Sequence, residues 1–257
     1  MTVVDIKGVS KEFKGGTVAL QGIDLEIEQG EFVSLIGPSG CGKSTLLRVI
    51  GDLIEPTQGT ITVNGKPARK AREDHDYGIV FQDSVLYDWR TVAKNVALPL
   101  ELAGWSREKR ARRVEEMLDL VELRGFGNHH PWQLSGGMQQ RVSIARALAF
   151  EPALLLMDEP FGALDEMTRE RLNAELLDIW QGSGSTVVFV THSIAEAVFL
   201  STRVVVMSPR PGRISKVIPV DLPQPRTQAT REEPRFFELA TEVREALHFG
   251  GQVEVPA

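Results

Sequence analysis

The chain has 257 residues, a formal net charge of −6 and a hydrophobic fraction of 42%. This length suits one large domain, or a domain with a substantial insertion, and the hydrophobic fraction is sufficient for a core. The negative charge argues against general nucleic-acid binding, which requires a basic surface. No stretch approaches the ~18 consecutive apolar residues of a membrane span, and residues 1–7 lack the charged-then-apolar layout of a signal peptide, so we expect a cytosolic chain.

The first part of the chain has the pattern of antiparallel strands. Short apolar or alternating runs at residues 3–6 and 23–27 are broken by glycine-containing turns. Residues 59–63 and 78–81 form a further pair of runs, which we interpret as framing an Asn64-Gly65 turn. We therefore expect an N-terminal antiparallel β layer.

Residues 37–45, here called the phosphate loop, follow a strand-like run at residues 31–36 and match the pattern Gly-x-x-x-x-Gly-Lys-[Ser/Thr]. In this pattern backbone N–H groups cradle phosphates, Lys43 adds a positive charge and the Ser44 hydroxyl can bind Mg²⁺. The helix predicted to follow directs its positive end at the same anion. The candidate nucleotide ligands are Gly37, Pro38, Ser39, Gly40, Cys41, Gly42, Lys43, Ser44 and Thr45. The alternatives are a glycine-rich turn with an exposed lysine and, for the only cysteine, a reactive thiol or a small filler residue.

A helical insertion is predicted after the first strands, because the pattern of apolar and polar residues over 92–149 is helical. Within residues 106–123 the apolar side chains that recur at i, i+3, i+4 and i+7 are Val114, Met117, Leu118 and Val121. Basic residues at 107–113 are followed closely by acidic ones, which indicates a solvated helix face. We place this helical subdomain at about residues 90–150.

The second half of the chain alternates apolar strands with helices. Continuous apolar runs occupy residues 153–157, 186–190 and 204–207, and helical patterns at residues 166–180 and 194–200 separate them. Such alternation is typical of a parallel sheet covered on both faces. The predicted fold class is therefore α/β, with a parallel sheet, an N-terminal antiparallel β layer and an inserted helical subdomain.

The last forty residues begin with prolines that mark turns and an extended linker, and a helix with an apolar stripe follows. The stripe consists of Phe236, Leu239, Val243 and Leu247. This helix either packs on its own domain or makes a regulatory or dimer contact. We expect one domain over residues 1–230 and a helical extension over residues 231–257.

Four polar residues stand at the ends of predicted strands. Because ligands of open α/β sheets bind at the carboxyl ends of strands, we expect all four near the nucleotide phosphates. Asp158 is predicted to hold Mg²⁺, mainly through water, and Glu159 to orient water for attack on the γ-phosphate. His192 could hydrogen-bond a γ-phosphate oxygen, and the amide of Gln82 could bind Mg²⁺ or the attacking water. The alternatives are solvated strand-end acids and a structural histidine.

A second anion site is predicted where Ser135, Gly136 and Gly137 open a helix. Ser135 is a good N-cap, and the helix continues with an apolar face. The exposed N–H groups at this helix start favour an anion. Since the phosphate loop already serves the same phosphate, two anion sites imply a partner.

This combination of motifs resembles the ATP-binding cassette (ABC) family from about residue 3 to residue 215, in the family's order. The resemblance implies a P-loop NTPase (RecA-like) core that uses ATP and Mg²⁺. It also implies a homodimer with two shared ATP sites, because Leu-Ser-Gly-Gly of one subunit closes on ATP held by the phosphate loop of the other.

The resemblance assigns further roles. Phe13 matches the aromatic residue that stacks on adenine, Gln82 matches the Q-loop, and residues 162–165 match the D-loop, which crosses the dimer interface. Asp158 and Glu159 match the Walker B acids, and His192 matches the switch histidine. The expected catalytic residues are Glu159, His192, Gln82 and Lys43. The expected metal ligands are Ser44, Gln82 and Asp158. The expected nucleotide contacts outside the phosphate loop are Phe13, Ser135, Gly136, Gly137 and Asp165.

Several residues are similar to importer ATPases that serve nitrate, sulfonate, taurine and related small molecules. Met138 replaces the usual glutamine of the signature, and Gly162 replaces a common serine of the D-loop. Residues 89–92 and 207–214 also match this subgroup, whereas residues 86–89 depart from its usual Leu-Leu-Pro-Trp. The departure lies near the groove expected to receive a membrane subunit.

The resemblance implies the ATP-hydrolysing subunit of an importer of this subgroup. Its partners would be a second copy of itself, transmembrane permease subunits and, indirectly, a substrate-binding protein, with no nucleic acid. The chain would lie peripherally at the cytoplasmic face of the inner membrane. The alternatives are a cassette of a lipid-trafficking system, a cassette that remodels ribosomes or DNA complexes without transport, and a small-molecule P-loop kinase.

Overall fold

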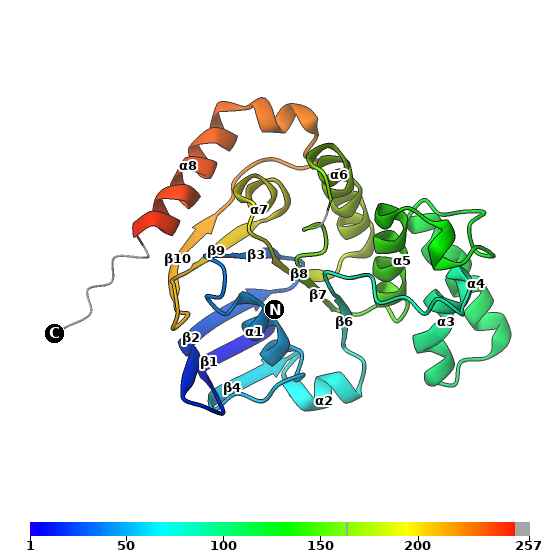
Figure 1. Cartoon of the computed structure of the whole chain (residues 1–257), viewed down its shortest axis with the longest axis horizontal. Coiled ribbons are helices and arrows are strands. Elements are labelled where there is room, and N and C mark those ends of the chain that lie inside the picture. Colours follow the sequence, from blue (N-terminus) through cyan, green and yellow to red (C-terminus); the bar gives the residue numbers. More distant parts are fainter. Residues whose placement is uncertain (163, 250–257) are drawn as a thin grey trace.

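Two β-sheets with helices around them form the part of the chain that the computed structural model describes, residues 1–162 and 164–249 (Figure 1). The smaller sheet contains β1 (Thr2–Phe13), β2 (Thr17–Glu28), β4 (Gln58–Val63) and β5 (Lys66–Pro67), in the order β2-β1-β4-β5. Its paired strands are antiparallel, which confirms the predicted N-terminal layer.

One predicted pairing is wrong. The turn Asn64-Gly65 joins β4 to β5, and the run at 78–81, predicted to pair across this turn, instead belongs to β6 (Tyr77–Val80) in the other sheet. Helix α2 (Ala68–Glu73) lies between β5 and β6, so β6 cannot fold back across the turn.

The larger sheet has the order β10-β9-β3-β8-β7-β6. Its strands are β10 (Ile214–Pro219), β9 (Arg203–Met207), β3 (Phe32–Ile36), β8 (Thr186–Val190), β7 (Leu154–Asp158) and β6 (Tyr77–Val80). All neighbouring strands are parallel except β10, which runs antiparallel to β9. Every residue of β3, β7 and β8 is buried, as expected for strands covered on both faces.

Helices lie on both faces of the larger sheet, and α3 (Val92–Leu102) and α4 (Arg107–Leu120) pack against α5 (Gly136–Leu148) beside it. The other helices around this sheet are α1 (Lys43–Ile50), α6 (Glu166–Ser183), α7 (Ile194–Leu200) and α8 (Pro234–Phe249), with short 3₁₀ turns at Pro131–Gln133 and Gln228–Glu232. Figure 1 shows α3, α4 and α5 grouped at the right, whereas α1 lies between the two sheets. The predicted face of α4 is confirmed, because Val114, Met117 and Leu118 are buried.

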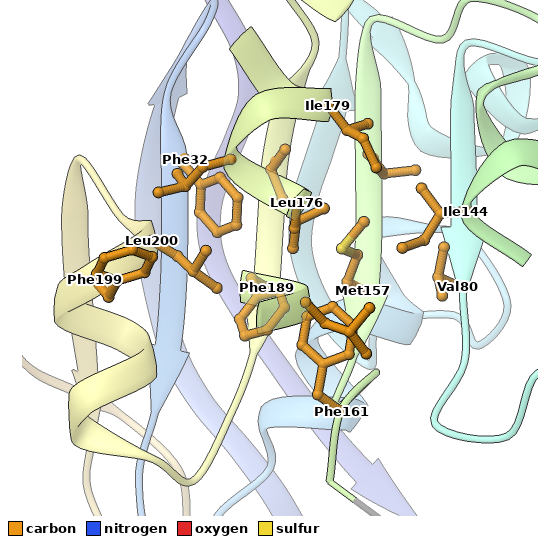
Figure 2. Close-up of a cluster of buried hydrophobic side chains, with 14 of the residues drawn as sticks. Phe32, Val80, Ile144, Met157, Phe161, Leu176, Ile179, Phe189, Phe199 and Leu200 are labelled. Atoms are coloured by element: carbon orange, nitrogen blue, oxygen red, sulfur yellow. The ribbon is translucent and has the colours of Figure 1, made fainter. Parts of the chain in front are cut away.

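The hydrophobic interior has two parts. One lies around α1 and between the sheets, and it contains Ile27, Leu46 and Val188. The other lies on the opposite face of the larger sheet, where Phe32 and Phe189 have ring centroids 5.7 Å apart (Figure 2). The sheet is thus fixed from both sides, and its carboxyl ends can hold polar groups in a rigid frame.

The C-terminal helix packs on its own domain. Phe236, Leu239 and Val243 of α8 are buried, and α8 contacts α7, β9 and β10. In the linker before it, the buried Arg226 donates to the carbonyls of Phe199 and Ser201 at the end of α7, both at 2.8 Å. Burial lowers the pKa of Arg226 to about 10. The division at residue 230 stays a prediction, and residues 250–257 of the predicted extension lie outside the described residues.

No helix of the described residues is both long and apolar enough to cross a membrane.

Candidate functional site

The phosphate loop joins β3 to α1, and the packing behind it requires its glycines. Gly40 and Gly42 have φ of 74° and 109°, a region that side chains other than glycine disfavour. A Cβ on Gly42 would come within 2.8 Å of the Ala19 carbonyl oxygen. The buried Lys43 Nζ donates to the carbonyls of Gly37, at 2.9 Å, and Pro38, at 3.2 Å. The predicted loop is therefore a closed turn with its lysine folded inside.

Ser44 and Asp158 lie together at the carboxyl ends of β3 and β7. The Ser44 hydroxyl donates to Asp158 Oδ1 at 2.7 Å, and Arg48 approaches Asp158 Oδ2 at 3.8 Å. Mg²⁺ prefers oxygen ligands, typically one or two carboxylates with phosphates and waters. A hydroxyl and a carboxylate in contact beside the phosphate loop fit that donor set.

Glu159 and His192 also meet at this edge. The Nδ1 atom of His192 is 3.4 Å from Glu159 Oε2, and both side chains are partly exposed. Glu159 has a left-handed backbone with φ of 46°, and its N–H donates to the Val190 carbonyl at 3.0 Å. A non-glycine residue with such a backbone often marks a functional site. The imidazole is thus placed to hydrogen-bond the Glu159 carboxylate directly.

Gln82 follows β6 and lies, like Glu159, next to Gly162. Within residues 1–162 and 164–249 the Gln82 side chain makes no hydrogen bond. Its Nε2 atom would be 3.4 Å from a Cβ added to Gly162. It lines a pocket of about 310 Å³ together with Gly136, Gln139 and Leu164. The pocket places Gln82 beside the start of α5, and its predicted binding of Mg²⁺ or the attacking water stays a prediction.

The second anion site has the predicted local geometry. Ser135 is the N-cap of α5, and its hydroxyl accepts from the Met138 N–H at 3.3 Å. Ser135 and Gly136 are exposed. Among the described residues, a Cβ added to Gly136 would meet Leu164 at 3.9 Å. A Cβ added to Gly137 would have its nearest contact with Leu172, at 3.5 Å. No described atom of the phosphate loop lies within 4 Å of either position, and Figure 1 shows α1 and α5 well separated.

Phe13 and Asp165 lie on two further elements, at the end of β1 and before α6. Phe13, at the end of β1, is 41% exposed, and the Nζ atom of Lys11 lies 5.4 Å from its ring centroid. Asp165 is the N-cap of α6 and accepts from the Thr168 N–H at 3.0 Å, which lowers the pKa of its carboxyl. Ala163, in the predicted D-loop, lies outside the described residues.

Of the two alternatives for Cys41, a reactive thiol or a small filler residue, its surroundings favour the filler residue. It is buried beneath the phosphate loop, and burial raises the pKa of its thiol. A thiol with a raised pKa is a poor nucleophile.

Sequence reasoning missed the residues that support these loops. Arg169 of α6 donates to the carbonyls of Phe161, at 3.4 Å, just before the D-loop, and Leu164, at 2.6 Å, within it. The buried Glu196 of α7 accepts from the Thr191 hydroxyl, next to His192. The position of Glu196 on the helix directly after His192 was the only indication in the sequence of such a supporting role. The sequence around Arg169 gave no such indication, because it is that of an ordinary surface residue of α6.

Comparison with known proteins decides the family, because the ABC transporter family profile matches residues 20–162. The chain belongs to the ABC transporter family. Its predicted resemblance is thereby confirmed, and so is the predicted activity, since ATP-binding subunits of ABC transporters are ATPases.

This ABC cassette has relatives along nearly its whole length. The nitrate import ATP-binding protein NrtD of Synechocystis sp. is 45% identical over 253 residues, 96% of this chain and 94% of NrtD. The aliphatic sulfonates import ATP-binding protein SsuB of Bacillus cereus is 44% identical over 255 residues, 98% of each chain.

Solved structures confirm the P-loop NTPase fold of the ABC cassette. The ATP-binding cassette MJ0796, solved as a dimer in a post-hydrolysis state with ADP and Pi, has a TM-score of 0.73 and 39% identity over 84% of this chain and 98% of that chain. CbiO1 of Clostridium perfringens, part of the ABC transporter complex cbiONQ, has a TM-score of 0.79 and 25% identity over 96% of this chain and 98% of that chain.

Proposed function

We propose that this cassette is the ATP-hydrolysing subunit of an importer for a small anion of the nitrate or organosulfonate kind. The observation that carries the proposal is the near end-to-end similarity to NrtD and SsuB. Separate permease subunits would form the transmembrane path, a substrate-binding protein would deliver the cargo, and the cassette would lie at the cytoplasmic face of the membrane.

Two copies of the chain form the working unit. The phosphate loop and the helix start at Ser135 occupy separate parts of one chain, so a single chain cannot close both on one phosphate. The packing around Gly136 and Gly137 leaves ordinary contact distances for a methyl group, and glycine is unfavourable in helices. Gly137 is buried against α6 of its own chain, whereas the exposed Gly136 serves the close approach of something outside the chain, which in this proposal is ATP on the second copy.

The phosphate loop and the residues at the strand ends have different roles in ATP hydrolysis. The phosphate loop and Lys43 bind the β- and γ-phosphates, while Ser44 and Asp158 hold Mg²⁺. Magnesium, when bound, neutralises charge that develops on the phosphates. Glu159 acts as general base toward water, and His192, at 3.4 Å from Glu159, orients that carboxylate and contacts the γ-phosphate.

The remaining predicted residues connect the nucleotide to its partners. Phe13 stacks on adenine and Asp165 faces the second copy. Gln82 reaches the nucleotide only after its side chain leaves the pocket that it shares with Gly136. This movement would report the bound γ-phosphate to the helical subdomain, where a permease docks.

Replacement of the general base tests the chemistry. Glu159→Gln should lower ATP turnover of the assembled importer by about 10²–10⁴-fold, the typical contribution of general-base catalysis. Binding of ATP should be retained, because the amide keeps the size of the side chain. Turnover in a phosphate-release assay and ATP binding by equilibrium titration give the two readouts.

The matched control is Glu245→Gln, on the exposed side of α8 and far along the chain from the site. It should leave turnover unchanged. Turnover of Glu159→Gln within a few-fold of the unaltered protein would remove Glu159 from the role of base.

Mixed dimers test the shared sites. A Ser135→Arg chain and a Lys43→Ala chain, combined in one dimer, should retain at most one competent site, because each lesion falls on a different half of a site. Activity equal to the unaltered dimer, with monomers in solution, would contradict the sandwich.

A further inference from the structure

A turn far along the chain forms the back wall of the phosphate loop. It spans residues 208–213, directly after β9. The Gly212 N–H donates to the Ala19 carbonyl and the Gln21 N–H donates to the Gly212 carbonyl, both at 3.0 Å. A Cβ on Gly212 would overlap the carbonyl oxygen of Cys41 in the loop. The turn and the loop are therefore in backbone contact.

The turn is also closed by its own hydrogen bonds. The Ser208 hydroxyl accepts from the Arg213 N–H at 3.1 Å and lies 3.3 Å from the Pro211 carbonyl, to which it can donate. Two prolines restrict its backbone further. The side chain between them, Arg210, is consequently presented from a rigid support.

Arg210 places a cation on the outside of the phosphate loop. Its Nε and one terminal nitrogen both donate to the Gly40 carbonyl, at 3.2 and 3.1 Å. Within residues 1–162 and 164–249 no carboxylate lies within 4.0 Å of the Arg210 nitrogens. The guanidinium charge is thus not neutralised by an acid of the described chain, and it stands beside a loop that binds anions.

We infer that Arg210 is a positioning residue for nucleotide binding: it fixes the Gly40 peptide and adds positive potential at the phosphate loop. Gly40 has a left-handed backbone, with φ of 74°. Holding its carbonyl oxygen outward keeps the following N–H groups directed at the phosphates. A hydrogen bond from a charged donor is stronger than one between neutral groups. The inference rests on the proposed function, in which the phosphate loop binds ATP.

The chain contains a matched control in the same turn. Arg213 is exposed and donates to the Gln21 side chain at 2.7 Å, so Arg213→Ala removes the same charge without a contact to Gly40. Arg210→Lys keeps the charge but loses the two-donor fork.

The experiment measures the Kd of ADP with Mg²⁺ for the full-length chain and the three variants by titration calorimetry. Arg210→Ala should raise Kd roughly three- to tenfold, the order expected for an exposed hydrogen bond from a charged group. Arg210→Lys should recover part of this loss, and Arg213→Ala should stay within twofold. In the assembled importer, Arg210→Ala should raise KM for ATP more than it lowers kcat.

Each outcome bears on the inference. Unchanged Kd for Arg210→Ala, or an equal rise for Arg213→Ala, would overturn it, and so would a drop in the melting temperature large enough to unfold part of the chain during the titration. Failure of the unaltered chain to bind ADP would instead contradict the proposed function.

Discussion

The two glycine-containing segments that are proposed to bind anions differ in what requires their glycines. In the phosphate loop, a Cβ on Gly37 would come within 2.7 Å of Cys41 Sγ, and one on Gly42 within 2.8 Å of the Ala19 carbonyl oxygen. At the start of α5, a Cβ on the exposed Gly136 would have its nearest contact, with Leu164, at 3.9 Å, an ordinary van der Waals distance. The chain's own packing thus requires glycine at the first site and only permits it at the second.

This difference separates a site that is complete within one chain from one that depends on a second molecule. The phosphate loop is shaped by β2, β9 and the turn at residues 208–213, and it would keep its form in an isolated chain. The start of α5 is exposed and only its cap is made internally. Substitutions at the first site should therefore change stability, whereas those at the second should change activity.

The largest effect on stability is expected behind the phosphate loop. Gly212→Ala places a methyl group on the Cys41 carbonyl oxygen, so backbone must move. We expect a loss of about 1–3 kcal/mol in the free energy of unfolding, as for other overpacked sites. Denaturant unfolding followed by circular dichroism measures it. An unchanged midpoint of unfolding would show that the turn can shift freely. The interpretation of the turn as a rigid support for Arg210 would then be wrong.

A smaller effect is expected at the cap of α5. Ser135→Ala should cost about 1 kcal/mol in unfolding free energy, since it removes the acceptor of the Met138 N–H. Ser135→Asp keeps a good cap and so should keep stability, but its negative charge should repel the phosphate of the second copy. ATP turnover that survives Ser135→Asp would argue against an anion at this helix start.

Gly136→Ala should give an effect of opposite sign. Because the space is sufficient and alanine favours helix, the isolated chain should gain up to about 0.5–1 kcal/mol in unfolding free energy. Turnover of the dimer should nevertheless fall, since the methyl group at this exposed position would stand where ATP is proposed to approach. A destabilised chain would mean that the fold itself needs this glycine, and the contrast between the two sites would disappear.

The smallest effect is expected next to His192, where a buried acid supports the loop. Burial raises the pKa of Glu196, and Oε1 of Glu196 and Oδ1 of Asn173 are buried without hydrogen-bond partners among the described residues. The folded chain therefore binds this proton more tightly than the unfolded chain. The stability it contributes is fully present below the ordinary glutamate pKa of 4.5 and is lost as pH rises through the raised pKa of Glu196.

Glu196→Gln should flatten this dependence and lose little stability at neutral pH, because its amide can donate to Asn173 Oδ1. Unfolding free energies measured across pH 4–8 compare the variant with the unaltered chain. Equal slopes in both would show that Glu196 does not titrate in this range.

Much of the site could be predicted from short patterns. The phosphate loop, the N-cap at Ser135 and the acids after β7 each depend on a few consecutive residues, whose backbone conformation local chemistry largely sets. The meeting of Ser44 with Asp158 followed because the phosphate loop after β3 and the end of β7 lie at the same edge of one parallel sheet. The position of Gln82 could not be predicted, since it depends on how the pocket beside α5 packs.

The sequence by itself determined the family motifs, the buried strands and the helix starts, because these arise from periodicity and capping within a few residues. Only the tertiary structure decided which sheet receives β6, and it alone brought Arg210 to Gly40 across 170 residues of chain. Contacts of this kind depend on strand order and on the backbone packing behind the loop. A local pattern contains neither, and for that reason the support of the phosphate loop became visible only in the folded chain.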